Sequence, residues 1–184
     1  MRTILDKLVT VLDNRRTFQW LLGMNILVVF ATLLISRNTF LSDGWSYLGL
    51  AEGILHGEYS MWWTLDEPYP DTFRAPGYPL LIAFFTWLTG SWKSMFVVHF
   101  ILYWVGLWFV LRILKEITPQ RAVQSLFLLL LLPLINIPFY IGQLYTEIPV
   151  LAAMSVVLYL LLRKPRARWW DAPVLGITLG LIHL

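Results

Sequence analysis

Three ionisable side chains stand beside apolar stretches of this sequence and can take part in acid–base or anion-binding chemistry. Asp43 and Glu147 are carboxylates, which can accept a proton from a reacting hydroxyl group. Arg74 offers a planar fork of five donors, which suits a pair of phosphate oxygens. Three such groups suggest a site if the fold brings them to one boundary of the apolar segments.

Each of these residues also has an ordinary structural explanation. Asp43 can be an acid in the first turn of a helix, where the helix dipole stabilises it. Arg74 opens the rigid turn Arg-Ala-Pro-Gly-Tyr-Pro and can be a snorkelling anchor beside a membrane. Glu147 can be a first-turn acid before Pro149, although no basic residue in its loop neutralises it. From spacing alone, both interpretations stay open.

The composition indicates that the elements carrying these residues lie in lipid. Hydrophobic residues make up 58% of the 184 and charged residues only 14%, against roughly 45–50% and about 25% in soluble domains. Almost uncharged stretches near the ~20 residues that cross a bilayer as a helix cover residues 17–36, 94–111, 122–141 and 148–162. The predicted fold class is all-α: a polytopic transmembrane helical bundle.

The stretch between residues 37 and 75 has a different character. It holds six of the eleven acidic residues and only two basic ones, so we expect a long extramembrane loop. Ser42 and Asp43 can begin a helix whose apolar positions continue to a stop at His56-Gly57. The tryptophan pair that follows predicts that this loop lies at the membrane interface.

Residues 76–90 are apolar but short for a span, and their placement decides the side of every later loop. If they cross, five Lys and Arg residues lie inside and nine outside; if they form a surface or re-entrant helix, eleven lie inside and three outside. The positive-inside tendency favours the second arrangement. Residues 1–16 then form a cytoplasmic amphipathic segment.

The predicted order is therefore five membrane segments with one long outer loop, residues 37–93, between the first and the second. The segments cover residues 17–36, 94–114, 122–141, 146–163 and 172–184. Asp43, Arg74 and Glu147 all fall at the outer surface in this arrangement. The fifth segment is too short to cross, so we expect a truncated chain or a part of a longer protein.

Several classes of site are excluded or disfavoured. The absence of cysteine excludes disulfides and thiolate metal sites, and the three histidines show no metal-ligand spacing. The net charge is only +3, and the basic residues flank apolar segments as cytoplasmic anchors do. We therefore expect no nucleic acid partner.

Three motifs carry a resemblance to a known family. They are Ser42-Asp43-Gly44-Trp45-Ser46-Tyr47 after the first span, the turn that runs from Arg74 to Pro79, and Tyr145-Thr146-Glu147 before a later span. Together, in this order and on one membrane face, they resemble the N-terminal half of a GT-C glycosyltransferase. That group includes protein O-mannosyltransferases and lipid A aminoarabinose transferases.

The resemblance implies transfer of a sugar from a polyprenyl-phosphate donor to an acceptor lipid, glycan or protein at the outer face of a bacterial or archaeal plasma membrane. It makes Asp43 and Glu147 the catalytic carboxylates, and Arg74 and Tyr78 the residues at the donor phosphate. It is compatible with a divalent cation but requires no cofactor. Relatives continue through further spans, so the missing C-terminal half is an expected partner and the isolated chain is expected to lack appreciable activity.

The residue types suit an inverting, single displacement, in which a carboxylate takes the acceptor's proton and cationic donors hold the departing phosphate. Two other classes stay open. A non-catalytic membrane subunit or scaffold would need none of the three charged residues. A lipid or solute transporter would place polar groups near the bilayer midplane, where the spans offer only Gln19, Asn25, His99 and Asn136.

Overall fold

The computed structural model describes residues 2–35, 42–134, 140–163 and 170–183, and every regular element in these ranges is a helix. The all-helical fold predicted from the sequence is confirmed. The helices are α1 (Arg2–Asp13), α2 (Arg15–Ile35), α3 (Ser42–Leu55), α4 (Gly77–Thr89), α5 (Ser94–Ile117), α6 (Arg121–Leu131), α8 (Glu147–Leu162) and α9 (Asp171–His183).

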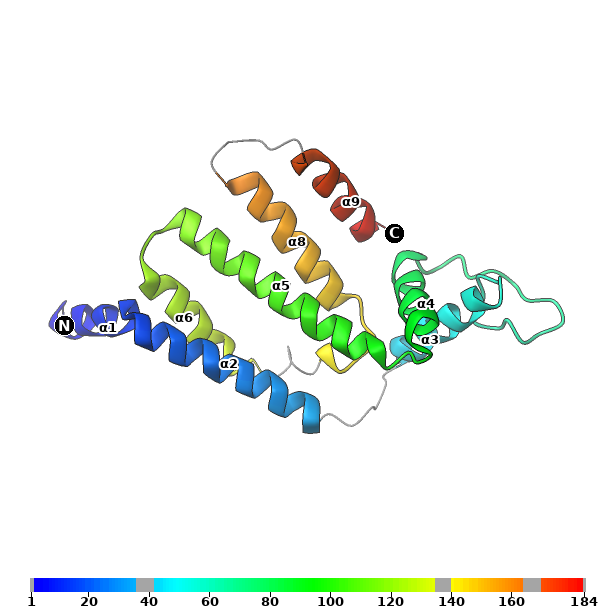
Figure 1. The fold of residues 1–184 in the computed structure, drawn as a ribbon, viewed down its shortest axis with the longest axis horizontal. Coiled ribbons are helices and arrows are strands. Elements are labelled where there is room, and N and C mark those ends of the chain that lie inside the picture. The colour runs from blue at the N-terminus through cyan, green and yellow to red at the C-terminus, as the bar shows by residue number, and fades with distance from the viewer. Residues whose placement is uncertain (1, 36–41, 135–139, 164–169, 184) are drawn as a thin grey trace.

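The longer helices lie side by side, and two smaller groups extend from their ends (Figure 1). α8 packs between α5 and α9, and α2 packs on α6. At one end, α3 and α4 pack against each other and carry the long loop between them as a projection. α1 lies at the opposite end and packs on α6. The fold therefore has two distinct ends with a helical body between them.

Within the described residues, α5 is the helix that is long and apolar enough to cross a membrane, by length and composition. It has 24 residues, whereas α4, α6 and α8 are apolar helices of 10–17 residues. The sequence predicted several crossings. The crossing of the membrane by the other helices belongs to the proposal made below.

One predicted span is much longer than the helix found there. α6 ends at Leu131, whereas the apolar stretch predicted a helix over 122–141. A turn follows in which the amide of Leu134 donates to the carbonyl oxygen of Leu131 (3.1 Å), and Pro133 in that turn has no amide proton to continue the helical ladder. Residues 135–139, with Asn136, lie outside the described residues.

The short helix α4 covers most of the segment 76–90, for which a surface or re-entrant helix was predicted. It ends at Gly90, whose φ of 73° is left-handed and whose amide donates to the carbonyl oxygen of Thr86 (2.8 Å). Glycine adopts this conformation without a Cβ clash, which is why α4 ends there. The chain then reverses into α5.

Close backbone contact and a buried amide hold the helical body together. A Cβ built on Gly106 of α5 would lie 3.2 Å from the Cα of Ala152 of α8, so a small residue is needed for these helices to approach so closely. On the other side, the buried Asn25 of α2 donates to the carbonyl oxygen of Leu128 (3.1 Å). Leu128 lies in the last turn of α6, where carbonyls lack a helical partner.

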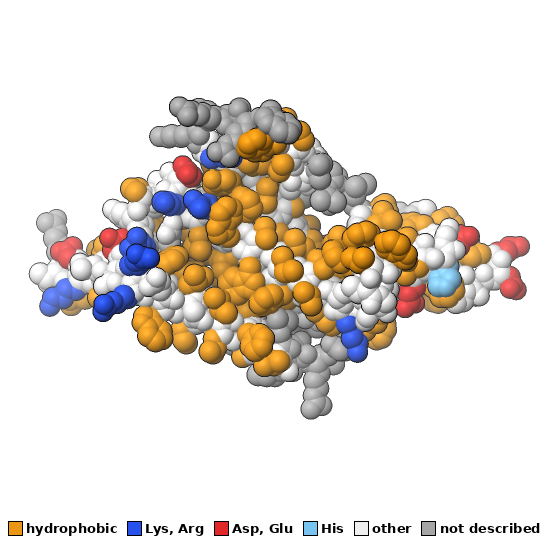
Figure 2. Space-filling view, in the orientation of Figure 1, with side chains coloured by type: hydrophobic (Ala, Val, Ile, Leu, Met, Phe, Trp, Pro, Cys, Tyr) orange, Lys and Arg blue, Asp and Glu red, His pale blue; other side chains and the backbone are white. Residues whose placement is uncertain are grey.

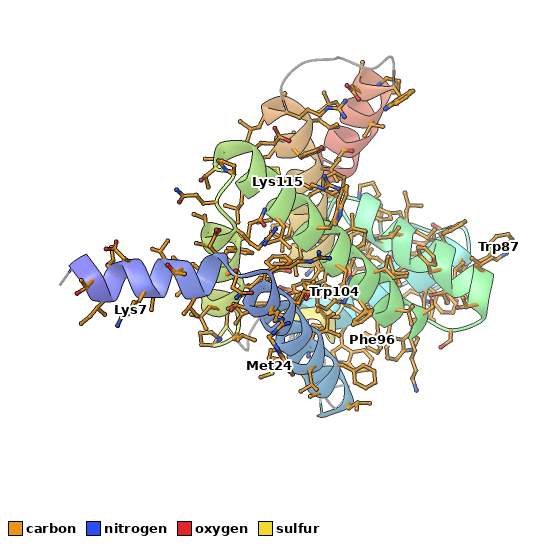
Figure 3. All side chains as sticks on the ribbon, turned by 60° about the vertical axis from the view of Figure 1, so that its left-hand side comes forward. Lys7, Met24, Trp87, Phe96, Trp104 and Lys115 are labelled. Carbon is orange, nitrogen blue, oxygen red and sulfur yellow. The ribbon has the colours of Figure 1, made fainter. Side chains whose placement is uncertain are left out.

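α1 is fixed to the body through its C-terminal turn. Leu12 is buried, and the Asp13 carboxylate accepts a hydrogen bond from the amide of Ala122 (3.1 Å), one of the unsatisfied amides at the N-terminus of α6. Lys and Arg side chains gather toward this end, while the surface of the body is mostly hydrophobic (Figure 2). Trp87 of α4 lies at the far end of the molecule from Lys7 of α1 (Figure 3).

Candidate functional site

The guanidinium of Arg74 is held by a tight turn that begins at Asp71. One Asp71 carboxylate oxygen accepts hydrogen bonds from the amides of Phe73 (2.8 Å) and Arg74 (3.0 Å), and the other lies 3.3 Å from the Arg74 Nη1. The Tyr59 hydroxyl donates to the Arg74 carbonyl oxygen (2.7 Å). Backbone and side chain of Arg74 are therefore both fixed, by residues that precede it rather than by the Pro-Gly turn that follows it.

These contacts lower the pKa of the Asp71 carboxyl below its ordinary value. Burial alone would raise the pKa of Asp71, but hydrogen bonds from the amides of Arg74 and Phe73 and the nearby Arg74 charge outweigh it, so the pKa is lowered. Sequence reasoning treated Asp71 only as one acid of the outer loop. The spacing Asp-X-X-Arg could have identified it, since an aspartate often bonds the amides two and three residues on.

Asp43 lies beside the same guanidinium, on a different element. It is in the first turn of α3, and its Oδ1 is 3.9 Å from the Arg74 Nη2. The Asp43 side chain is 64% exposed, whereas that of Arg74 is 21% exposed. An exposed pair at this distance contributes little stability. Asp43 is thus accessible to a solute that also contacts Arg74.

Aromatic rings continue from Arg74 into the core. The Arg74 guanidinium lies over the Tyr47 ring, 5.9 Å from its centre, and Tyr47 meets Tyr78 edge to face at 5.0 Å. Tyr47 is one turn along α3 from Asp43, which places both residues on the same helix face. The Tyr78 hydroxyl is hydrogen-bonded to His99 Nε2 (3.0 Å), so this hydroxyl faces the core rather than the Arg74 guanidinium.

Glu147 reaches the same region as the exposed first residue of α8. Its neighbour Tyr145 reports on its surroundings. The pKa of the Tyr145 phenol is raised. Burial is the largest cause, and the negative charges of Asp43 and Glu147 add to it. Both carboxylates therefore act on one phenol, although they are far apart in the sequence. The fold brings Asp43, Arg74 and Glu147 to one region.

An apolar cavity of about 400 Å³ opens from this region into the helical body. Its wall includes Ala75, the residue after Arg74, and Thr146, the residue before Glu147. Further in, it is lined mostly by aliphatic side chains of the helices: Leu81, Leu102, Val105, Val150, Ala153 and Val156. Arg74 and Glu147 are not part of the lining, but each is the direct chain neighbour of a lining residue, so charged side chains lie next to a mostly hydrophobic cavity. Such a cavity suits a ligand with an anionic head and an apolar chain.

No group of three histidine, aspartate or glutamate side chains that could hold a metal ion is found among the described residues. Comparison of the chain with protein-family models, with curated proteins and with solved structures returns no match. A function for the chain must therefore be argued from the site itself.

Proposed function

We propose that this chain is a membrane glycosyltransferase, or part of one, that transfers a sugar from a polyprenyl-phosphate donor to an acceptor at the outer membrane face. The observation that carries the proposal is the position of the Asp43 and Arg74 pair beside the mostly apolar cavity. An anionic lipid-linked substrate needs both features, a fixed cation for its head and an apolar cavity for its chain.

Placement of the body in a membrane is supported by its surface. α5 is long and apolar enough to cross, and large apolar side chains on other helices are exposed, including Trp20 (75%) and Leu27 (62%) on α2. A contiguous exposed apolar surface is unfavourable in water and suits lipid. With α2, α6, α8 and α9 also in the bilayer, the end with α3 and α4 is the outer one, because the Lys and Arg side chains gather at the other end.

Arg74 is the group that meets the donor phosphate in this proposal. Its guanidinium is pre-positioned by Asp71, so little conformational entropy is lost when it binds an anion. As the bond between the anomeric carbon and the phosphate oxygen breaks, the leaving phosphate gains negative charge. A fixed cation stabilises that charge.

The new glycosidic bond forms between the oxygen of the acceptor hydroxyl and the anomeric carbon of the sugar. The hydroxyl oxygen attacks the anomeric carbon, the bond to the phosphate breaks, and the hydroxyl proton passes to a carboxylate. Asp43 is the better placed base, because it lies beside Arg74 and is exposed. Glu147, the exposed first residue of α8, would orient the acceptor or donor sugar. A single displacement of this kind inverts the anomeric centre.

The cavity accounts for the lipid part of the donor. The isoprenoid next to the phosphate would lie against Leu102 and Val105 of α5 and Val156 of α8, all of which line the cavity. A volume of about 400 Å³ holds only the first isoprene units, so the remaining chain extends into the surrounding lipid.

A transporter is less well supported by the same structure. Transport sites place polar groups along a path near the midplane. Two of the described candidates are engaged elsewhere: Asn25 donates to the carbonyls of Leu21 and Leu128, and the buried His99 bonds Tyr78 and Ile141. These groups connect helices to one another and do not line the cavity.

Donor binding tests the proposal without requiring turnover. The purified chain in detergent is labelled with a polyprenyl phosphate that carries a diazirine on its first isoprene unit, and the labelled peptides are identified by mass spectrometry. We expect labelling on α4, α5 or α8, competed by polyprenyl phosphate but not by polyprenol of the same length. Arg74→Gln should abolish the preference for phosphate, whereas Lys93→Gln, in the same outer region, should keep it. Equal competition by the polyprenol would refute the proposal.

A further inference from the structure

His99 is the buried polar side chain that connects the two sides of the candidate site. It lies on α5 and is completely buried. Its Nε2 is 3.0 Å from the Tyr78 hydroxyl, and its Nδ1 is 3.3 Å from the carbonyl oxygen of Ile141. These two partners belong to segments that are distant in the sequence, α4 and the connection that leads to α8.

The partners determine how the ring is protonated. A carbonyl oxygen only accepts, so Nδ1 must carry a hydrogen and donate it to Ile141. In a neutral ring Nε2 is then the acceptor, and the Tyr78 hydroxyl donates to it. A buried imidazole whose two nitrogens are both hydrogen-bonded avoids the cost of an unsatisfied polar group. His99 therefore acts as a two-sided connector with defined directions.

Each partner carries one part of the site. Tyr78 closes the turn that starts at Arg74, lines the cavity, and packs against Tyr47, over which the Arg74 guanidinium lies. Ile141 is a buried residue of the short connection that ends at Glu147. Movement of either segment relative to α5 would change the separation of Arg74 and Glu147.

We propose that His99 is a positioning residue that fixes the Arg74 turn and the Glu147 connection to each other across the cavity. The expected effect of His99 on donor binding rests on the proposed function. The relative position of the two segments can be measured without any donor. A purely space-filling role for His99 would need no defined tautomer. It would also show no energetic coupling with the Tyr78 hydroxyl.

Two substitutions separate the two hydrogen bonds. In His99→Asn the side-chain amide replaces Nδ1 and can still donate to Ile141, while the bond to Tyr78 is lost. In His99→Gln the amide oxygen reaches the Nε2 position and can still accept from Tyr78, while the bond to Ile141 is lost. Tyr78→Phe removes only the hydroxyl. Tyr103→Phe removes the hydroxyl of another buried tyrosine, one turn further along α5, and is the matched control.

Distance measurements between spin labels provide the first readout. The chain contains no cysteine, so Phe73→Cys and Thr146→Cys, next to Arg74 and Glu147, can be labelled without background. We expect a single narrow distance distribution in the parent chain and a broader one with Tyr78→Phe, His99→Asn or His99→Gln. Tyr103→Phe should leave it narrow. An unchanged distribution in Tyr78→Phe, which differs by one oxygen atom, overturns the inference even if the His99 variants do not fold.

Nitrogen-15 spectra of the histidine rings provide the second readout. We expect a neutral ring protonated at Nδ1 whose signals disappear in His99→Gln, and the Nε2 resonance of that ring should shift in Tyr78→Phe. His56, whose Nδ1 lies 2.8 Å from the carbonyl oxygen of Glu52, is told apart because its signals remain in His99→Gln. Protonation at Nε2, or an Nε2 resonance unaffected by Tyr78→Phe, overturns the assignment.

Donor affinity is the third readout. Tyr78→Phe and His99→Asn should each weaken polyprenyl-phosphate binding about five- to tenfold, the size expected for one hydrogen bond, and the double variant should be no weaker than either single one. Additive losses in the double variant contradict the shared bond. Absence of donor binding in the parent chain counts against the proposed function only, because the spin-label and nitrogen-15 results still decide the role of His99.

Discussion

The Arg74 guanidinium lies 3.9 Å from the Asp43 carboxylate and 3.3 Å from that of Asp71, and the two contacts differ in kind. The Asp71 side chain is 10% exposed and its carboxylate also accepts two amide hydrogen bonds, so this contact belongs to the turn. Asp43 is 64% exposed and comes from another helix. A ligand that binds Arg74 can therefore displace Asp43 while Asp71 keeps the guanidinium in place.

The first prediction concerns the pH dependence of the Asp71 turn. The pKa of Asp71 is lowered from its ordinary value of 3.8 on folding. Its ionised form therefore stabilises the fold fully above that value, and the stabilisation is lost as the pH falls through the lower folded pKa. We expect thermal unfolding in detergent to show a smaller loss of stability between pH 5 and pH 3 for Asp71→Asn than for the parent chain. Asp66→Asn, in the same loop, is the control, and identical pH profiles for Asp71→Asn and the parent would contradict the prediction.

A second prediction follows from the close approach of α5 and α8. Gly106→Leu adds a side chain whose Cβ starts 3.2 Å from the Ala152 backbone, so the helices must separate. We expect a loss of about 1–3 kcal/mol in the free energy of unfolding. Gly23→Leu is the matched control, because a Cβ at Gly23 of α2 meets nothing within 4 Å. Equal stability of the two variants would show that the interface tolerates a larger side chain.

The charge distribution gives a third prediction, on topology. Single cysteines at Glu58 and Glu67, in the outer loop, should react with a membrane-impermeant maleimide added to intact cells. A cysteine at Glu116, at the C-terminal end of α5, should react only after the cells are opened. Reaction of position 116 from outside, together with positions 58 and 67, would overturn this topology and require α4 to cross the membrane.

The sequence predicted the helical elements better than their connections. Apolar composition and basic flanks are local properties, so α2, α5 and α8 begin and end within a few residues of the predicted spans. α6 ends at Leu131, close to Pro133, which has no amide proton to continue the helical hydrogen bonds. The apolar stretch in the sequence continues beyond this point, so the predicted helix was too long. Hydrophobicity alone does not show where within an apolar stretch a helix ends.

Asp43, Arg74 and Glu147 could be named as candidates from the sequence because each stands beside an apolar segment in the predicted topology. His99 could not be assigned its role in the same way. It lies in a span with no pattern around it, and its partners come from α4 and from the connection before α8. Only the packing of three distant segments gives this histidine its two hydrogen bonds.

The fourth prediction separates a phosphate contact from a membrane anchor at Arg74. Arg74→Lys keeps the positive charge but loses the planar fork. A lysine serves equally well as a snorkelling anchor. We expect Arg74→Lys to insert and fold normally but to bind polyprenyl phosphate at least tenfold more weakly, measured by competition of the photolabel. Arg121→Lys, at the far end of the molecule, should bind as the parent does, and parental affinity in Arg74→Lys would favour the anchor.

The last prediction concerns Asp43 as the base, tested in proteoliposomes that contain the proposed glycosyltransferase and a polyprenyl-phosphate sugar. Asn ranks beside Asp at a helix N-terminus, so Asp43→Asn should leave α3 intact. It cannot accept a proton from the acceptor. We expect turnover to fall by the ~10²–10⁴ associated with general base catalysis. Donor affinity should change little, since Arg74 stays anchored by Asp71.

The two measurements together distinguish the interpretations of Asp43. Parental turnover in folded Asp43→Asn would reduce Asp43 to a first-turn acid. A fall in donor affinity equal to the fall in turnover would instead assign it to substrate binding, because a base acts on the chemical step. Turnover and donor affinity of Glu147→Gln are measured for comparison with those of Asp43→Asn. Asp66→Asn is an outer-loop control that should change neither quantity. A loss confined to the chemical step in Asp43→Asn, with donor affinity kept, is the outcome that the exposed position of this carboxylate beside Arg74 predicts.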